Sequence, residues 1–205
     1  MTARRPWIRA PGPVAAGLRI GLLGGSFDPA HGGHLYVSQI ALKALKLDYV
    51  WWLVSPGNPR KPLPNALGVR LARARNAAQH GRIFVTDIEA RMGTRFTVDS
   101  VGALQKRFPQ VDFVWLMGSD NLEQFSRWRH WQQIAARIPI AVARRPGAVL
   151  ASLSAPLARR IGVSRRLGHA PSLVVLDGPR SLESSTRLRE QALGAAAEAV
   201  LNLTP

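Results

Sequence analysis

The sequence predicts an α/β fold built on an open, mostly parallel β-sheet with helices on both faces. Apolar runs alternate with segments of helical pattern, which is typical of parallel strands joined by crossover helices. Several runs, such as Tyr49–Val54, are almost continuously apolar, as expected of strands covered on both faces. The length of 205 residues fits one domain with a sizeable core.

The predicted elements alternate from strand to helix along the chain. The apolar runs predict strands over Arg19–Leu23, Tyr49–Val54, Ile83–Thr86, Val111–Met117, Pro139–Ala143 and Leu173–Leu176. The segments between them predict helices over Gly33–Lys46, Leu67–Gln79, Thr97–Arg107, Asn121–Phe125, His130–Ala135 and from Ser184 onward. Ligands of such sheets bind beyond the carboxyl ends of the strands, so site residues are expected in the loops and helix starts that follow them.

Two segments lie outside this regular alternation. Residues 1–17 carry arginines together with Pro, Ala and Gly, and they lack the apolar stretch of a signal peptide. We therefore expect a basic, flexible extension over residues 1–17, followed by a single domain over residues 18–205. Residues 146–166 show no clean period, and they could form either a helical insertion or a surface excursion.

Composition excludes several classes of protein. The chain has no cysteine, which excludes disulfides and thiolate metal sites and fits a reducing compartment, so a cytoplasmic location is expected. No apolar stretch is long enough to span a membrane, and no membrane partner is expected. The net charge of +16 suits polyanionic substrates such as a nucleoside triphosphate, but the basic residues are scattered, so no specific nucleic-acid partner is expected.

The most informative segment is Gly24-Gly25-Ser26-Phe27-Asp28-Pro29-Ala30-His31-Gly32-Gly33-His34. A strand that breaks into a Gly-rich turn and then opens a helix presents backbone N–H groups to phosphate oxygens. The two histidines lie three residues apart, on one face of the first helical turn, and both could reach the same anion. The segment is neither the dinucleotide fingerprint nor a Walker loop, because it lacks the spacing of both.

This segment resembles the signature of nucleotidyltransferases that share a His-x-Gly-His motif, and more closely that of bacterial nicotinate-nucleotide adenylyltransferases. Further segments resemble the same family in its order along the chain: Pro56–Lys61, Arg95–Asp99, Gly118–Leu122, Trp128, Arg144–Gly147 and Ser184–Arg189. The resemblance covers residues 18 to the end. It implies a Rossmann-like nucleotidyltransferase fold and transfer of the adenylyl group of ATP to nicotinate mononucleotide, with release of pyrophosphate, in NAD biosynthesis.

The resemblance also implies roles for individual residues. His31 and His34 would be catalytic and would bind ATP. The other residues expected to bind ATP are Gly24, Gly25, Ser26, Phe27, Gly118, Asp120, Arg145, Ser184, Ser185, Thr186 and Arg189. The glycines and Ser26 would keep the turn open, and Phe27 would pack beneath it. The residues expected to bind the mononucleotide are Lys61, Phe96, Thr97 and Trp128.

Mg²⁺ is expected to accompany ATP, held mainly by the phosphates and water rather than by a protein metal site. Asp28 is expected to shape the turn. The oligomeric state, monomer or homo-oligomer, is left open.

Other functions also fit parts of the sequence. Another adenylyl- or cytidylyltransferase, such as a pantetheine-phosphate adenylyltransferase, would keep the histidine pair, but it would lack Gly118-Ser119-Asp120 followed by Trp128. A basic nucleic-acid-binding protein on the same fold would shift RNA or DNA without releasing pyrophosphate. A redox protein of the dinucleotide-binding class is disfavoured because its fingerprint is absent.

Overall fold

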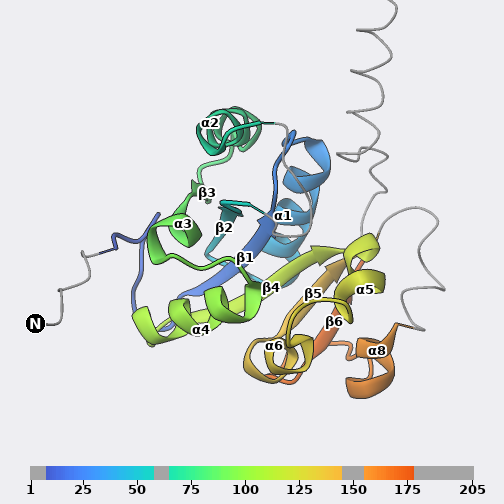
Figure 1. Ribbon diagram of the computed structural model, residues 1–205. Helices are drawn as coiled ribbons and strands as arrows, with labels where there is room; N and C mark the ends of the chain where they lie inside the picture. The colour runs from blue at the N-terminus through green and yellow to red at the C-terminus, as the bar shows by residue number, and fades with distance from the viewer. Residues whose placement is uncertain (1–7, 58–64, 145–154, 178–205) are drawn as a thin grey trace, which may run out of the picture.

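Six parallel strands form one open sheet, in the order β3-β2-β1-β4-β5-β6 (Figure 1). The computed structural model describes residues 8–57, 65–144 and 155–177. The strands are β1 (Arg19–Gly25), β2 (Tyr49–Val54), β3 (Ile83–Thr86), β4 (Asp112–Gly118), β5 (Ile140–Ala143) and β6 (Leu173–Leu176). The predicted parallel α/β sheet is confirmed, and β2, β3 and β6 have the predicted bounds.

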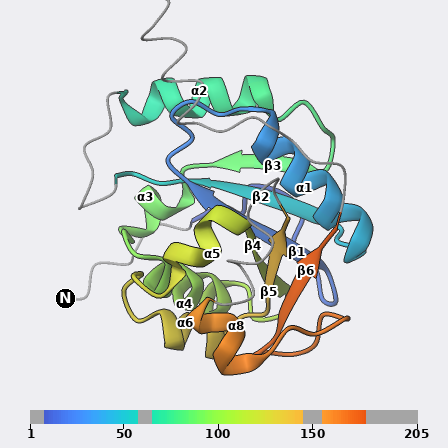
Figure 2. The same ribbon diagram turned by 90° about the vertical axis from the view of Figure 1, so that its right-hand side faces the viewer.

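Helices cover both faces of this sheet. They are α1 (Gly32–Ala44), α2 (Leu67–Ala77), α3 (Ile88–Met92), α4 (Thr97–Arg107), α5 (Ser119–Phe125), α6 (Trp131–Arg137) and α8 (Pro156–Ile161). Figure 2 shows α1 and α2 on one side of the sheet and α3, α4, α5, α6 and α8 on the other. None of the described helices is long and apolar enough to cross a bilayer.

The core consists of two apolar layers, one on each face of the sheet. Strand side chains alternate between them: Leu22 packs in the layer under α4 and α6, whereas Leu23 packs in the layer under α1 and α2. Trp51 and Trp52 divide in the same way, and both are fully buried. Because both faces are apolar, the strands read as continuous apolar runs rather than as alternating patterns.

Several boundaries differ from the predictions. Strand β1 extends to Gly25, so Gly24 and Gly25 end a strand and do not form the turn. A Cβ on Gly24 would lie 2.7 Å from Cη2 of Trp115 in β4, so this glycine makes room for the indole ring. The short helix α3 was not predicted, because five residues are too few for a helical period to show.

Two less regular segments are partly described. Within residues 146–166, residues 156–161 form the helix α8. Of the expected extension over residues 1–17, residues 8–17 are described, and they lie against the domain. Ile8 and Val14 pack on the core, and the Gly17 N–H donates to the Gln110 carbonyl oxygen at 3.2 Å. This part of the chain therefore belongs to the packed domain.

The direction of the chain connections reverses at one place in the sheet. From β1 the chain continues to β2 and β3 on one side, then returns to β4, β5 and β6 on the other side of β1. Parallel sheets bind ligands in the crevice at such a switch point, beyond the carboxyl ends of the strands. The histidine turn follows β1, and Gly118 ends β4. The topology thus places both segments beside the switch point.

Candidate functional site

The two histidines of the turn hold each other in place at the start of α1. His31 is the N-cap residue, and its Nδ1 accepts the Gly33 N–H at 3.0 Å. Nδ1 of His34 accepts the His31 N–H at 3.3 Å, which completes a reciprocal capping box. The two rings lie 4.0 Å apart between centroids. The predicted pairing of the histidines on the first helical turn is therefore present.

These caps also fix the tautomer of each imidazole. In a neutral ring one nitrogen accepts and the other carries the proton. Since Nδ1 accepts in both rings, Nε2 is the donor in both. A Cβ on Gly25 would lie 3.9 Å from Nε2 of His34. Gly25 therefore leaves space beside that donor, although it does so from the end of a strand.

Two aromatic side chains, Phe27 and Trp52, pack against the His34 ring. Phe27 is fully buried and has a φ of 49°, in the left-handed region. Its ring stacks on Trp52 at 5.1 Å and lies 4.5 Å from the His34 ring. The Trp52 indole N–H donates to Ser38 Oγ at 2.8 Å, and Ser38 donates to the His34 carbonyl oxygen at 2.9 Å. Phe27 thus packs under the turn with its side chain buried, and its expected contact with ATP stays a prediction.

Arg70, on α2, fastens the turn to the neighbouring strand. Its side chain is 1% exposed. It donates to three carbonyl oxygens: those of Ser26 at 2.7 Å, Ser55 at 2.8 Å and Asn65 at 3.0 Å. Burial lowers the pKa of Arg70, and the nearby Asp28 carboxylate opposes this effect. Sequence reasoning missed Arg70, although it occupies the apolar face of α2 beside the buried Leu71 and Ala74, which is an unusual place for an arginine.

Asp28 is buried, and it shapes the turn as expected. Its Oδ1 accepts the Asn65 side-chain amide at 2.7 Å, and its Oδ2 accepts the Asn65 N–H at 3.4 Å. Among the described residues no group of three His, Cys, Asp or Glu side chains gathers where it could hold a metal ion.

Three of the four residues expected to bind the mononucleotide, Phe96, Thr97 and Trp128, lie on the α4 face of the sheet, opposite the face that carries α1. Phe96 is the N-cap residue of α4 and Thr97 its first residue, and no side chain caps this helix. Phe96 and Trp128 are half-buried against the same apolar layer. The Trp128 ring packs 5.1 Å from Phe125 and 6.1 Å from Trp115. The structure therefore brings Phe96, Thr97 and Trp128 to one region.

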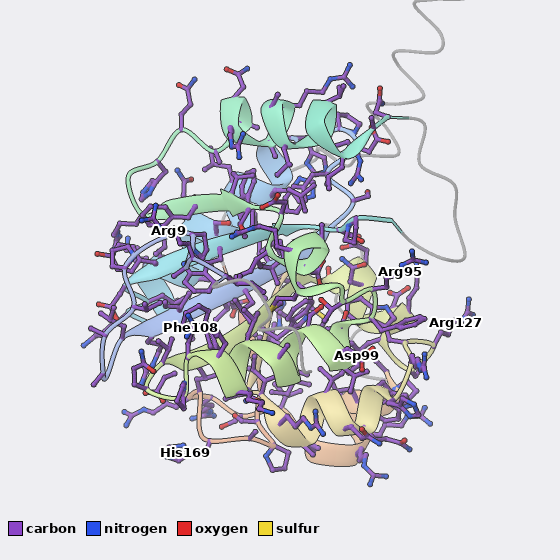
Figure 3. All side chains as sticks on the ribbon, turned by 60° about the vertical axis from the view of Figure 1, so that its left-hand side comes forward. Arg9, Arg95, Asp99, Phe108, Arg127 and His169 are labelled. Carbon is purple, nitrogen blue, oxygen red and sulfur yellow. The ribbon has the colours of Figure 1, made fainter. Side chains whose placement is uncertain are left out.

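Charged side chains of both signs border this region. The guanidinium of Arg129 lies 4.6 Å over the Phe96 ring. Figure 3 shows Arg95, Asp99 and Arg127 at the end of α4 where the helix begins, and Phe108 at its opposite end. Gly118 is the N-cap residue of α5, and Asp120 lies exposed in the first turn of that helix.

Glu89 is the second charged residue that sequence reasoning missed. It lies on α3 and is 7% exposed. Burial raises the pKa of its carboxyl to about 7, and a hydrogen bond from the Ser100 hydroxyl opposes the rise. No periodic pattern of apolar residues surrounds Glu89 in the sequence, so its burial could not be predicted there.

Six of the expected site residues lie outside the described part of the chain: Lys61, Arg145, Ser184, Ser185, Thr186 and Arg189. The neighbouring Arg144 is described, and its guanidinium forms an ion pair with Asp177 at 3.0 Å, just beyond the carboxyl ends of β5 and β6.

Comparison with known proteins finds similar sequences and similar folds. Residues 22–191 match the model of the family described as cytidylyltransferase-like. A Cereibacter sphaeroides protein named "Probable nicotinate-nucleotide adenylyltransferase" is 53% identical, covering 83% of this chain and 96% of its own length. A Parvibaculum lavamentivorans protein of the same name is 50% identical, covering 87% and 94%.

One solved structure has the same fold at low sequence identity. Nicotinic acid mononucleotide adenylyltransferase of Plasmodium falciparum, complexed with NaAD, superimposes with a TM-score of 0.68 at 17% identity. The match covers 84% of this chain and 83% of that one. At this identity the likeness shows the fold alone, and it agrees with the parallel sheet described above.

Proposed function

Because this chain belongs to the cytidylyltransferase-like family and is about half identical to nicotinate-nucleotide adenylyltransferases, we propose that it transfers the adenylyl group of ATP to nicotinate mononucleotide. The products are nicotinate adenine dinucleotide and pyrophosphate, and the reaction belongs to NAD biosynthesis. The observation that carries the proposal is the pair of histidines that cap α1, just beyond β1 and beside the switch point of the sheet.

The histidine turn is suited to the triphosphate. The start of α1 carries the positive end of the helix dipole, and its first turn contains no acidic residue. The Nε2–H groups of His31 and His34 would donate to the phosphate oxygens of ATP. As the mononucleotide phosphate attacks the α-phosphorus and pyrophosphate leaves, charge grows on these oxygens. Donors held in place beforehand stabilise that charge without having to reorganise.

The remaining ATP-binding residues are proposed from the sequence resemblance. Arg145, Ser184, Ser185, Thr186 and Arg189 would contact the phosphates from the opposite side, and Lys61 would face the mononucleotide phosphate. Ser26 would contribute its backbone, while Gly24 and Gly25 would contribute open space at the end of β1. Gly118 and Asp120 would lie against the adenosine, with the Asp120 carboxylate accepting from a ribose hydroxyl.

Mg²⁺ is proposed to enter with ATP, held mainly by phosphate oxygens and water. When bound, it would neutralise part of the phosphate charge. Asp28 fits this proposal poorly as a metal ligand, because Asn65 donates to both of its carboxylate oxygens. A cytoplasmic location and the absence of a specific nucleic-acid partner stay predictions.

The start of α4 is proposed to hold the nicotinate ring. The uncapped N–H groups of its first turn, at Thr97, would donate to the ring carboxylate. Trp128 would stack on the ring, with Phe96 beside it. The Arg129 guanidinium, 4.6 Å from the Phe96 ring centre, adds a positive charge that favours a carboxylate over a neutral amide.

Pyrophosphate release tests this proposal directly. Purified protein is incubated with ATP, Mg²⁺ and either nicotinate or nicotinamide mononucleotide, and the dinucleotide product is identified by mass. We expect kcat/KM to favour the acid form by at least about tenfold, because N–H donors meet an amide NH₂ poorly. Equal use of the two mononucleotides would contradict the nicotinate specificity. Release with neither, together with a salt-dependent shift of RNA, would favour a nucleic-acid-binding protein.

A further inference from the structure

Glu89 is a buried carboxyl that the proposed reaction does not use. It lies on α3, the short helix between β3 and α4, and α3 packs against both β2 and α4. The two salt bridges found among the described residues do not include it. A buried carboxyl without a cation costs stability. Its presence therefore calls for a role that a smaller or apolar residue would not fill.

The contacts of Glu89 form a closed ring of hydrogen bonds. Oε1 accepts the Ser100 hydroxyl at 2.6 Å, which is a short hydrogen bond between two side chains. The hydroxyls of Ser100 and Thr94 lie 2.9 Å apart. The Glu89 carbonyl oxygen in turn accepts the Thr94 N–H at 2.9 Å. Glu89 is thus tied through both its side chain and its main chain to the start of α4.

This ring includes Thr94, which belongs to the segment that leads into the proposed mononucleotide site. The chain leaves α3 at Gly93, whose φ of 69° lies in the left-handed region, and passes through Thr94 to Phe96 and Thr97. Ser100, whose hydroxyl lies between Glu89 and Thr94 in the ring, also donates its N–H to the Phe96 carbonyl oxygen at 3.0 Å. The Glu89 carboxyl therefore acts on Phe96 through one intermediate residue.

No side chain caps α4. At α1, by contrast, the histidines cap their own helix. The ring therefore contacts the start of α4 without capping the first N–H groups of the helix.

We propose that Glu89 is a positioning residue for the mononucleotide: its carboxyl holds the segment Thr94–Thr97 in the geometry that receives the nicotinate ring. The inference rests on the proposed function, because it assigns the α4 start to that substrate. Glu89 does not touch substrate. It acts through Ser100 and Thr94, on the opposite side of the site from the histidine turn, so its effect should fall on one substrate alone.

The test compares two substitutions of nearly equal size. Glu89→Met keeps the length of the side chain but removes the acceptor, whereas Glu89→Gln keeps an acceptor for the Ser100 hydroxyl. Glu123→Gln removes a charge from an exposed site on α5 and serves as the control. For each variant the KM values for nicotinate mononucleotide and for ATP are measured by pyrophosphate release. Hydrogen exchange of the Phe96–Asp99 amides is measured in parallel without substrate.

For Glu89→Met we expect a rise of at least about tenfold in the KM for the mononucleotide, which corresponds to about 1.4 kcal/mol. The KM for ATP should change less than about twofold, and the Phe96–Asp99 amides should exchange faster. Glu89→Gln should stay within about threefold of the unmodified protein for both substrates, as should Glu123→Gln.

An unchanged mononucleotide KM in Glu89→Met, or equal rises for both substrates, would overturn the positioning role. So would a Glu89→Gln variant as impaired as Glu89→Met, since the acceptor would then not be what matters. Failure of the unmodified protein to release pyrophosphate would instead refute the proposed function. In that case, unchanged amide exchange in Glu89→Met would still count against the role of the ring.

Discussion

Raising the pH is expected to destabilise the unmodified protein more than its Glu89→Gln variant. Burial raises the pKa of the Glu89 carboxyl from 4.5 to about 7. Between these values the folded chain still holds a proton that the unfolded chain has released. Stability must therefore fall as the pH rises through this window, and the fall ends above the folded pKa. The Gln variant has no such proton and lacks this dependence.

The size of the Glu89 pKa shift determines how much the free energy of unfolding changes with pH. A difference of about 2.5 pKa units, from 4.5 to about 7, corresponds to about 3 kcal/mol of unfolding free energy at about 1.36 kcal/mol per unit. Most of this loss falls between about pH 5 and about pH 8. All other titratable groups are the same in the two proteins, so the difference between the two pH dependences isolates Glu89.

Urea unfolding followed by tryptophan fluorescence gives the required free energies. We expect the stability advantage of Glu89→Gln over the unmodified protein to grow by about 2–3 kcal/mol from about pH 5 to about pH 8. Glu123→Gln, at an exposed position, should show no such growth. If Glu89→Gln and the unmodified protein lost stability in parallel, the burial of a protonated carboxyl would be refuted.

Three further outcomes follow from the packing around the site. Arg70→Lys keeps a charge but loses the planar group that reaches three carbonyl oxygens, so urea unfolding should show a loss of at least about 2 kcal/mol. A loss below about 0.5 kcal/mol would argue that these three hydrogen bonds do not hold the turn in place. Gly24→Ala places a methyl group against Trp115 and should lower the free energy of unfolding by about 1–3 kcal/mol. Gly57→Ala should be nearly neutral, because a Cβ there would have no atom within 4 Å. Equal thermal midpoints of the two variants would count against close packing at Gly24. Trp128→Ala should raise the KM for nicotinate mononucleotide and for nicotinamide mononucleotide alike, because stacking does not distinguish the acid from the amide. A change in the ratio of the kcat/KM values for the two mononucleotides would place Trp128 at the ring carboxylate instead.

The sheet could be predicted because both of its faces are covered. Continuous apolar runs such as Tyr49–Val54 mark buried parallel strands, and β2 has the predicted bounds. The histidine turn was predictable too, because its residues are contiguous. The contacts of Arg70 and Glu89 could not be predicted, because they join separate segments of the chain. Arg70 reaches carbonyl oxygens up to 44 positions away, and the buried Glu89 lies on a helix that packs against both β2 and α4. A charge that is buried through tertiary contacts leaves no local pattern to recognise.

The central claim is that the histidine pair at the start of α1 stabilises charge during adenylyl transfer. The turnover number of His34→Ala tests it most directly, beside His31→Asn, which keeps a good N-cap for α1. His169→Ala is the control, because this exposed histidine (labelled in Figure 3) lies between α8 and β6 and is not among the residues assigned to the site. Each site variant should keep its circular dichroism spectrum and lose at least about a hundredfold in kcat, or about 2.7–4 kcal/mol, while His169→Ala stays unchanged. Turnover within a few-fold of normal in a folded His34→Ala variant would contradict the account.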